Sequence, residues 1–200
     1  IGAGATPVGR KIGLTSAAVQ KQLGVDQPDF GMLFDTMGFR GDAVKVSRGK
    51  LIAPRLEAEI ALILASDITT ELRDTEALRP FIQSVAAAGE IVDSAVAGWD
   101  IQIVDTVGDN ASSGLFVIGT PQPFDKSVDL AARAMRLTVD GELKSSGTGA
   151  ATMGSPLNAL LWLANIANAF GDPLRKGDIL RSGSLGPIIP FNPREYEIEI

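Results

Sequence analysis

The sequence contains no cysteine and no histidine among its 200 residues. Without cysteine there can be no disulfide, no thiolate nucleophile and no zinc–thiolate site. Without histidine the chain lacks the commonest general base, every Ser-His-Asp or Cys-His arrangement and the usual transition-metal ligand. Proton transfers must therefore run through Asp, Glu, Lys, Tyr or water, and a metal site must use oxygen ligands, which suit hard cations.

Long apolar runs and an excess of positive charge are also missing. No apolar stretch approaches the ~18–20 residues that cross a bilayer, and no signal-peptide layout is recognisable. The formal net charge of −6 argues against binding to nucleic acid or to an anionic membrane surface. The remaining composition is ordinary for a soluble globular protein, which favours a cytoplasmic location.

The two ends of the chain predict that it is part of a longer protein. It begins at Ile1 without a methionine and ends within the alternating stretch 195–200. We therefore expect further residues at both ends of a single catalytic domain that spans residues 1–200.

Hydrophobic periodicity and turn residues predict an α+β fold. Helices are expected between Ser16 and Gly24, over 79–97, and from Pro156 to Gly171 behind the N-cap Ser155. Strands are expected at 8–14, 56–66, 100–106, 114–118, 134–139, 142–146, 178–182, 187–191 and 195–200, with mostly loop and short strands over 25–50. Asp140-Gly141 is a strong two-residue hairpin signal. Strands joined by hairpins, with a few inserted helices, indicate a largely antiparallel or mixed sheet.

The most informative segment, Pro54–Leu64, contains two glutamates. Side chains alternate between the faces of a strand, so Glu57 and Glu59 share one face. Both faces become apolar after Glu59, which predicts a strand in the interior. Two carboxylates buried side by side repel each other and lose hydration, so they need a shared proton or a cation between them. The alternative is an exposed strand end, where both glutamates face water or pair with Arg55.

A third carboxylate comes from the predicted helix Phe81–Val96, in which Glu90 and Asp93 lie three residues apart on one side. The other members are mostly Ala, Val, Ile and Gly, so this helix is expected to be largely buried. The two acids either join the carboxylates of Glu57 and Glu59 or mark the solvated face of the helix. Three acids with neither histidine nor cysteine fit an open octahedral Mg²⁺ or Mn²⁺ site that water and substrate oxygens complete.

Several other polar residues carry weaker indications of a site. Lys11 lies in a short apolar strand, where a surface lysine is the ordinary alternative, and Asp29 follows Pro28 as a turn aspartate would. Ser112 and Ser113 belong to a polar cluster between two apolar strands. The segment Ser182-Gly183-Ser184 follows a strand, so its amides and hydroxyls can hold an anion or a carboxylate.

Seven segments of the chain form a familiar series: G-R-K-I-G-L-T-S, Q-P-D-F-G, P-R-L-E-A-E-I-A-L-I-L, G-E-I-V-D-S, D-T-V-G-D-N-A-S-S-G, P-L-N-A-L-L-W-L-A and G-D-I-L-R-S-G-S-L-G-P. Through them the chain resembles the 2-hydroxypenta-2,4-dienoate hydratases, also called 2-keto-4-pentenoate hydratases. Together with the 4-oxalocrotonate decarboxylases, they belong to the fumarylacetoacetate hydrolase superfamily. These segments follow in order over nearly the whole chain, so together they are more specific than any single motif.

The resemblance implies a fold, an assembly and a set of site residues. The fold is a mixed β-roll of the fumarylacetoacetate hydrolase C-terminal type with peripheral helices, and the assembly is a homo-oligomer, often pentamer-based. The family normally has an extra N-terminal helical segment and a few more C-terminal residues, as the ends of this chain predict. Residue by residue, the metal triad matches Glu57, Glu59 and Glu90, the active-site lysine matches Lys11, and the aspartate of the P-D-[FY]-G motif matches Asp29.

The implied reaction is hydration of 2-hydroxypenta-2,4-dienoate to 4-hydroxy-2-oxopentanoate in the catabolism of aromatic compounds. Lys11 and Asp29 are the candidates for acid, base and water-orienting roles, and Ser112, Ser113, Ser182, Gly183 and Ser184 for substrate binding. A decarboxylase or an aldolase is a conceivable partner enzyme by family habit.

Other functions stay open from the sequence. A 2-oxo-3-hexenedioate decarboxylase can use the same metal-chelated acid, and a fumarylacetoacetate-type C–C hydrolase usually needs a histidine dyad that this chain lacks. A non-catalytic subunit would be expected to lose a metal carboxylate or the lysine, and all of them are present.

Overall fold

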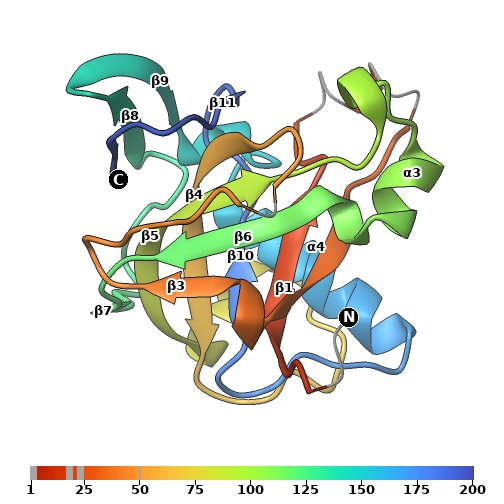
Figure 1. Ribbon diagram of the computed structural model, residues 1–200. Helices are drawn as coiled ribbons and strands as arrows, with labels where there is room; N and C mark the ends of the chain where they lie inside the picture. Colours follow the sequence, from red (N-terminus) through yellow and green to blue (C-terminus); the bar gives the residue numbers. More distant parts are fainter. Residues whose placement is uncertain (1–3, 17–19, 22–24, 50) are drawn as a thin grey trace.

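The computed structural model describes residues 4–16, 20–21, 25–49 and 51–200. Within them, a nine-stranded mixed sheet occupies the centre of the molecule, and its strands come from both ends of the chain (Figure 1). Two pairings, β1 with β10 and β3 with β6, are parallel, and the other pairings of the sheet are antiparallel. The strand order is β2 (Asp29–Phe34), β1 (Pro7–Gly13), β10 (Ile179–Arg181), β4 (Arg55–Leu64), β5 (Ile82–Val92), β6 (Ser113–Ile118) and β3 (Gly38–Arg40), with β11 (Ile189–Pro190) on β4 and β7 (Gln122–Pro123) on β5.

A smaller sheet of β12 (Tyr196–Glu199), β8 (Ala134–Val139) and β9 (Glu142–Thr148) lies at the upper left of Figure 1. Asp140 and Gly141 join β8 to β9 with φ values of 51° and 81°. Two successive positive φ values are what a tight turn between twisted antiparallel strands requires. The predicted hairpin is confirmed.

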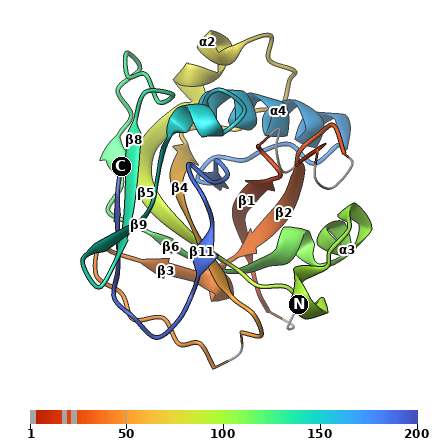
Figure 2. The ribbon, with the colours of Figure 1, turned by 90° about the horizontal axis from the view of Figure 1, so that it is seen from above.

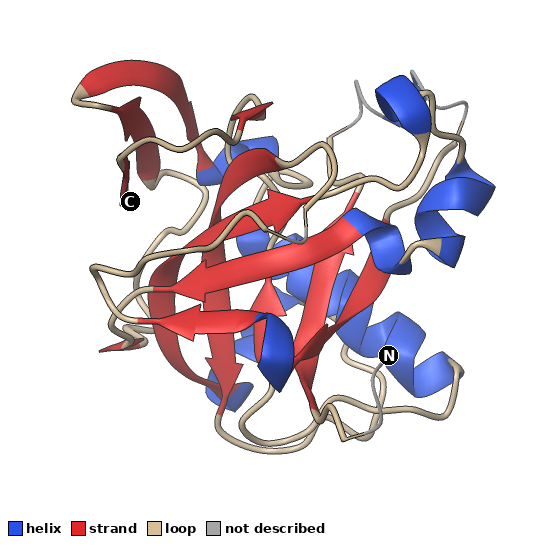
Figure 3. Ribbon diagram, in the orientation of Figure 1, coloured by secondary structure: helices blue, strands red, loops and turns tan. Residues whose placement is uncertain are grey.

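Helices are few in the described parts of the chain and lie around the strands (Figure 3). The longest, α4 (Pro156–Ala169), begins behind the Ser155 hydroxyl, which accepts a hydrogen bond from the Leu157 N–H, as the sequence predicts. Figure 2 shows α4 and α2 (Thr75–Leu78) on the same side of the sheet, with α3 (Ile103–Gly108) apart from them. No helix in the described ranges combines the length and apolarity needed to cross a membrane.

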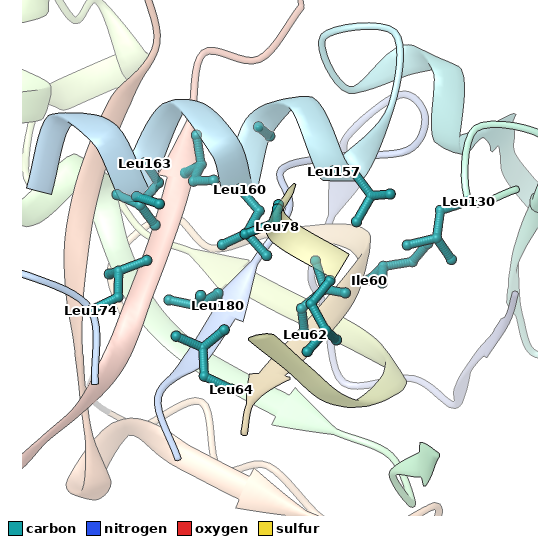
Figure 4. Close-up of a cluster of buried hydrophobic side chains, with 14 of the residues drawn as sticks. Ile60, Leu62, Leu64, Leu78, Leu130, Leu157, Leu160, Leu163, Leu174 and Leu180 are labelled. Carbon is teal, nitrogen blue, oxygen red and sulfur yellow. The ribbon is translucent and has the colours of Figure 1, made fainter. Parts of the chain in front are cut away.

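The main core lies between the large sheet and α4 (Figure 4). Strand β4 points Ile60, Leu62 and Leu64 toward α4, where Leu160 and Leu163 meet them. Because side chains alternate along a strand, the odd-numbered residues of β4 face the other way. The core therefore anchors the strand that presents Glu57 and Glu59 on its opposite face.

Two predicted elements are wrong. Residues 79–97 contain β5 in place of a helix, and residues 100–106 contain a loop and the start of α3 in place of a strand. Strand β5 is paired on both sides by β4 and β6 and buried on both faces over its second half, so its Ala and Gly residues show no alternation of period two. At the start of helix α3 the Asp105 carboxylate accepts a hydrogen bond from the Gln102 backbone N–H (2.8 Å). The helix expected between Ser16 and Gly24 lies mostly outside the described residues.

Candidate active site

Three carboxylates converge at the junction of β4 and β5. The register of this pair sets Glu57 directly opposite Glu90, and Glu59 lies two residues further along the same face. One oxygen from each of the three side chains lies within 4.8 Å of the others. Glu59 and Glu90 are fully buried and Glu57 is partly buried, so the alternative of exposed acids is excluded for this cluster.

Asp93, the other acid considered, has a different position. Its two carboxylate oxygens accept hydrogen bonds from the N–H groups of Ile52 (2.8 Å) and Ala53 (2.7 Å). It therefore fixes the loop before β4, and the structure brings Glu90 alone from this segment into the acid cluster.

Two buried cations contact the three acids. Nη2 of Arg181 lies 2.9 Å from Oε2 of Glu59 and 3.2 Å from Oε2 of Glu90. Nζ of Lys11 lies 3.4 Å from Oε1 of Glu90, on the other side of that carboxylate. Sequence analysis missed Arg181, although a charged residue directly after Ile179 and Leu180, within a predicted strand, could have indicated it.

Burial and mutual repulsion shift the acids' protonation. Burial, together with the charge of Glu90, raises the pKa of Glu57 to about 7. Burial likewise raises the pKa of Glu59 well above its usual value, against the opposing effect of Arg181. For Glu90 burial acts in the same direction, but the guanidinium of Arg181 and the ammonium of Lys11 outweigh it and lower its pKa. Burial would lower the pKa of Lys11, yet the surrounding carboxylates, first of all Glu90, raise it.

The acid cluster fits a divalent cation. Both oxygens of Glu59 and both oxygens of Glu90 are buried, and despite the nearby cations none accepts a hydrogen bond of good geometry from the described residues. Buried oxygens in this state are rare in folded proteins and call for a partner. An all-oxygen donor set with one side open to a pocket suits Mg²⁺ or Mn²⁺, which keep positions for water and substrate.

Proton release on metal binding is expected at Glu57. Its carboxyl group is largely protonated below pH 7 because its pKa is about 7, whereas a carboxylate ligand must be deprotonated. Addition of Mg²⁺ should therefore release protons below this pKa and fewer above it, and the apparent affinity should rise with pH across it. Calorimetric titration in two buffers of different ionisation enthalpy measures the release, and an equal release on both sides of the pKa would contradict this expectation.

The same raised pKa predicts how the metal-free protein responds to pH. Between the ordinary carboxyl pKa of 4.5 and about 7, Glu57 binds more protons in the folded chain than in the unfolded chain. The contribution of Glu57 to folding stability should therefore decrease as pH rises through this window.

A pocket of about 910 Å³ opens onto the acid cluster. Lys11, Asp29 and Glu57 line it, so the predicted lysine and aspartate lie beside the acids. Asp29 is the first residue of β2 and pairs with Gly13 of β1, which places its carboxylate diagonally across from Lys11. A Cβ on Gly13 would lie 2.2 Å from Asp29 Oδ1, so the glycine leaves the space that this carboxylate occupies. Asp29 is buried, and its Oδ1 has no hydrogen-bond partner in the described parts of the chain.

Of the five residues predicted to bind substrate, three line the pocket. Ser112, Gly183 and Ser184 line it, and the buried Ser112 hydroxyl has no partner within the described ranges. The Ser182 hydroxyl accepts from the Ile60 N–H (3.1 Å) and donates to the Gly183 carbonyl (3.0 Å), so it joins β10 to β4. Ser113 begins β6 and pairs with Val92.

Two lining residues of the pocket were not selected as site residues by sequence analysis. The guanidinium of Arg55 lies 4.3 Å from the ring centroid of Trp99, within range of a cation–π contact, and both residues line the pocket. The indole N–H of Trp99 donates to the Ala53 carbonyl (2.9 Å). These contacts hold Trp99 in the lining of the pocket.

The fumarylacetoacetate (FAA) hydrolase C-terminal family model matches residues 10–196. The chain belongs to this family. Among the curated relatives that this chain is similar to are two hydratases. A 2-keto-4-pentenoate hydratase of Burkholderia vietnamiensis is 52% identical over 182 residues, which cover 91% of this chain and 69% of the relative. A 2-hydroxyhexa-2,4-dienoate hydratase of Comamonas testosteroni is 46% identical over 184 residues, which cover 92% and 70%.

A solved structure of the family has the same architecture. The 4-oxalocrotonate decarboxylase from Pseudomonas putida G7, complexed with magnesium and adipate, superposes with a TM-score of 0.90 at 31% identity, over 98% of this chain and 73% of that chain. The expected α+β fold of the fumarylacetoacetate hydrolase type is confirmed.

Proposed function

We propose that this chain is a divalent-metal-dependent hydratase that adds water to 2-hydroxypenta-2,4-dienoate and forms 4-hydroxy-2-oxopentanoate. The observation that carries the proposal is the meeting of Glu57, Glu59 and Glu90 beside a histidine-free pocket that Glu57, Lys11 and Asp29 line. Identity of about half to curated 2-keto-4-pentenoate hydratases supports the substrate class.

Glu57, Glu59 and Glu90 would hold the metal ion. A relative's structure with magnesium and another with calcium support a hard divalent cation, and Mg²⁺ or Mn²⁺ is our proposal for this chain. When bound, the ion would supply Lewis-acid stabilisation of negative charge on the substrate's carboxylate and 2-oxygen.

The first half of the reaction moves one proton within the substrate. The 2-hydroxyl loses a proton, C5 gains one, and the double bonds shift to give a 2-oxo-3-enoate. Asp29 has a free buried oxygen and can accept a proton, whereas the Lys11 ammonium has only donors. We therefore assign Asp29 to proton removal and Lys11 to proton donation.

The second half adds water across C3 and C4. The hydroxyl group joins C4 and a proton joins C3, so the atoms of one water molecule enter the product. Between the two halves the proton that Asp29 took from the 2-hydroxyl passes to Lys11, which restores the carboxylate and the ammonium. Asp29 can then orient this water and take its proton while Lys11 donates a proton to C3, and a second transfer from Asp29 to Lys11 completes the cycle. The Ser112 hydroxyl and the backbone at Gly183 and Ser184 face the pocket, where they would position the substrate carboxylate or its tail.

Decarboxylation of 2-oxo-3-hexenedioate is the second candidate, because the 4-oxalocrotonate decarboxylase structure superposes so closely. The two reactions are separated by a substrate panel with and without EDTA. We expect metal-dependent loss of dienoate absorbance on the five-carbon substrate with no release of CO₂. Release of CO₂ from the six-carbon diacid, with no hydration of the five-carbon dienoate, would reject the hydratase in favour of the decarboxylase.

The wider setting of the enzyme stays a prediction. We expect a pentamer-based homo-oligomer, a cytoplasmic location, and cooperation with a decarboxylase or an aldolase. Light scattering of the purified protein measures the assembly.

A further inference from the structure

Arg181 is the most deeply buried charge in the described structure that the proposed reaction does not use. Its side chain is 0% exposed, and β10 places it beside Ala61 of β4, on the face that carries Glu59. Lys11 and Glu57 line the pocket, whereas Arg181 lies among the acids within the protein. The substrate side and the interior side of the acid cluster therefore carry different cations.

Arg181 forms ion pairs with two carboxylates but is not held by a hydrogen-bond network. Its Nη2 lies 2.9 Å and 3.2 Å from the Oε2 atoms of Glu59 and Glu90, yet Nε, Nη1 and Nη2 make no hydrogen bond of good geometry to residues of known placement. A guanidinium remains charged at every pH that a protein tolerates. Such a group is a permanent positive charge behind the two carboxylates.

The balance of charge explains why a permanent cation is useful there. When all three acids are ionised, the charges of Arg181 and Lys11 leave the cluster with one excess negative charge. Without Arg181, two fully buried carboxylates would face each other with Lys11 as the nearest cation. Removal of one partner from a buried ion pair is strongly destabilising because the other charge is left unpaired.

We propose that Arg181 is a positioning residue that acts as a built-in counter-cation and keeps Glu59 and Glu90 assembled when no metal ion is bound. The inference rests on the proposed metal site. It implies a trade-off, because the same positive charge repels an incoming divalent ion. The protein thereby gains metal-free stability and loses some affinity for the metal.

The test is thermal unfolding of Arg181→Met, with EDTA and with saturating Mg²⁺. In EDTA the midpoint should fall by roughly 10 °C, as expected for one broken buried pair in a domain of this size. Since the ion replaces the missing cation, Mg²⁺ should raise the midpoint of this variant about twice as far as that of the wild type. An Mg²⁺-induced shift equal to or smaller than that of the wild type would overturn the inference.

Arg10→Met is the matched control. Arg10 is also buried and in a strand of the same sheet, but it pairs with the side chain of Asp172, which lies outside the acid cluster. The midpoint of this variant should fall equally in EDTA and in Mg²⁺. A general loss of packing would make the two arginine variants behave alike, which would count against a special role for Arg181.

A double variant keeps the test decisive if Arg181→Met alone does not fold. Glu59→Gln removes the carboxylate that Arg181 contacts at 2.9 Å. Its addition to Arg181→Met should raise the midpoint in EDTA, because a buried unpaired charge disappears. A further decrease would overturn the counter-cation role. If Mg²⁺ leaves the unfolding midpoint of the wild type unchanged, the proposed metal site is refuted. The comparison of the single and double variants in EDTA would still decide the role of Arg181.

Discussion

Replacement of Glu57 by glutamine should lower kcat/KM for the dienoate about a thousandfold or more, since a bound metal ion supplies several kcal/mol of charge stabilisation. Glu57 is the informative position among the three acids. It lines the pocket. The described ion pairs of Arg181 and Lys11 are with Glu59 and Glu90 and do not include Glu57. The glutamine keeps the size and shape of the side chain, so the fold should persist while one charged ligand is lost.

Two measurements separate loss of the metal from loss of the fold. The variant should show a cooperative unfolding transition, and Mg²⁺ should no longer raise its midpoint as it does in the wild type. Glu197→Gln, on the exposed side of β12, is the control and should leave both properties unchanged. Near-normal activity of a folded Glu57→Gln variant would refute the metal assignment.

The sequence predicted much of the fold because most strands obey local rules. Strand β4 alternates an apolar and an acid-bearing face, the Asp-Gly turn joins β8 to β9, and Ser155-Pro156 starts α4. Strand β5 breaks such rules. It is paired on both sides and largely buried on both faces over residues 86–92. Its small residues Ala86–Ala88 therefore show no alternation, and in the sequence they cannot be told from the residues of a buried helix.

The structure brings together the three acids selected from the sequence, although one of them was expected on the wrong type of element. Glu90 was expected to approach Glu57 from a helix, but it does so from the neighbouring strand, directly opposite Glu57. Its identity as a buried acid among apolar residues did not depend on the type of element. The role of Arg181 could not be inferred in this way, because its contact with Glu59 depends on how β10 pairs with β4, which no local pattern reveals.

Replacement of Lys11 by methionine should lower kcat by roughly a hundredfold to ten-thousandfold, the range expected for loss of a positioned proton donor. Lys11 lines the pocket, its ammonium lies 3.4 Å from Glu90 Oε1, and the surrounding acids raise its pKa and keep it charged. Unlike Glu57→Gln, this variant keeps all three carboxylates. Its midpoint of unfolding should therefore still rise with Mg²⁺, and the rise should be at least as large as in the wild type because one competing positive charge is absent.

Lys11→Arg distinguishes proton donation from charge compensation. An arginine retains the positive charge beside Glu90 but does not release a proton in the pH range of catalysis. If Lys11 donates a proton to the substrate, Lys11→Arg should be nearly as inactive as Lys11→Met while it binds Mg²⁺ like the wild type. Recovery of most activity in Lys11→Arg would show that the charge alone matters. Lys144→Met, at an exposed strand lysine 2.8 Å from Glu142, removes a paired lysine away from the pocket and should leave kcat unchanged.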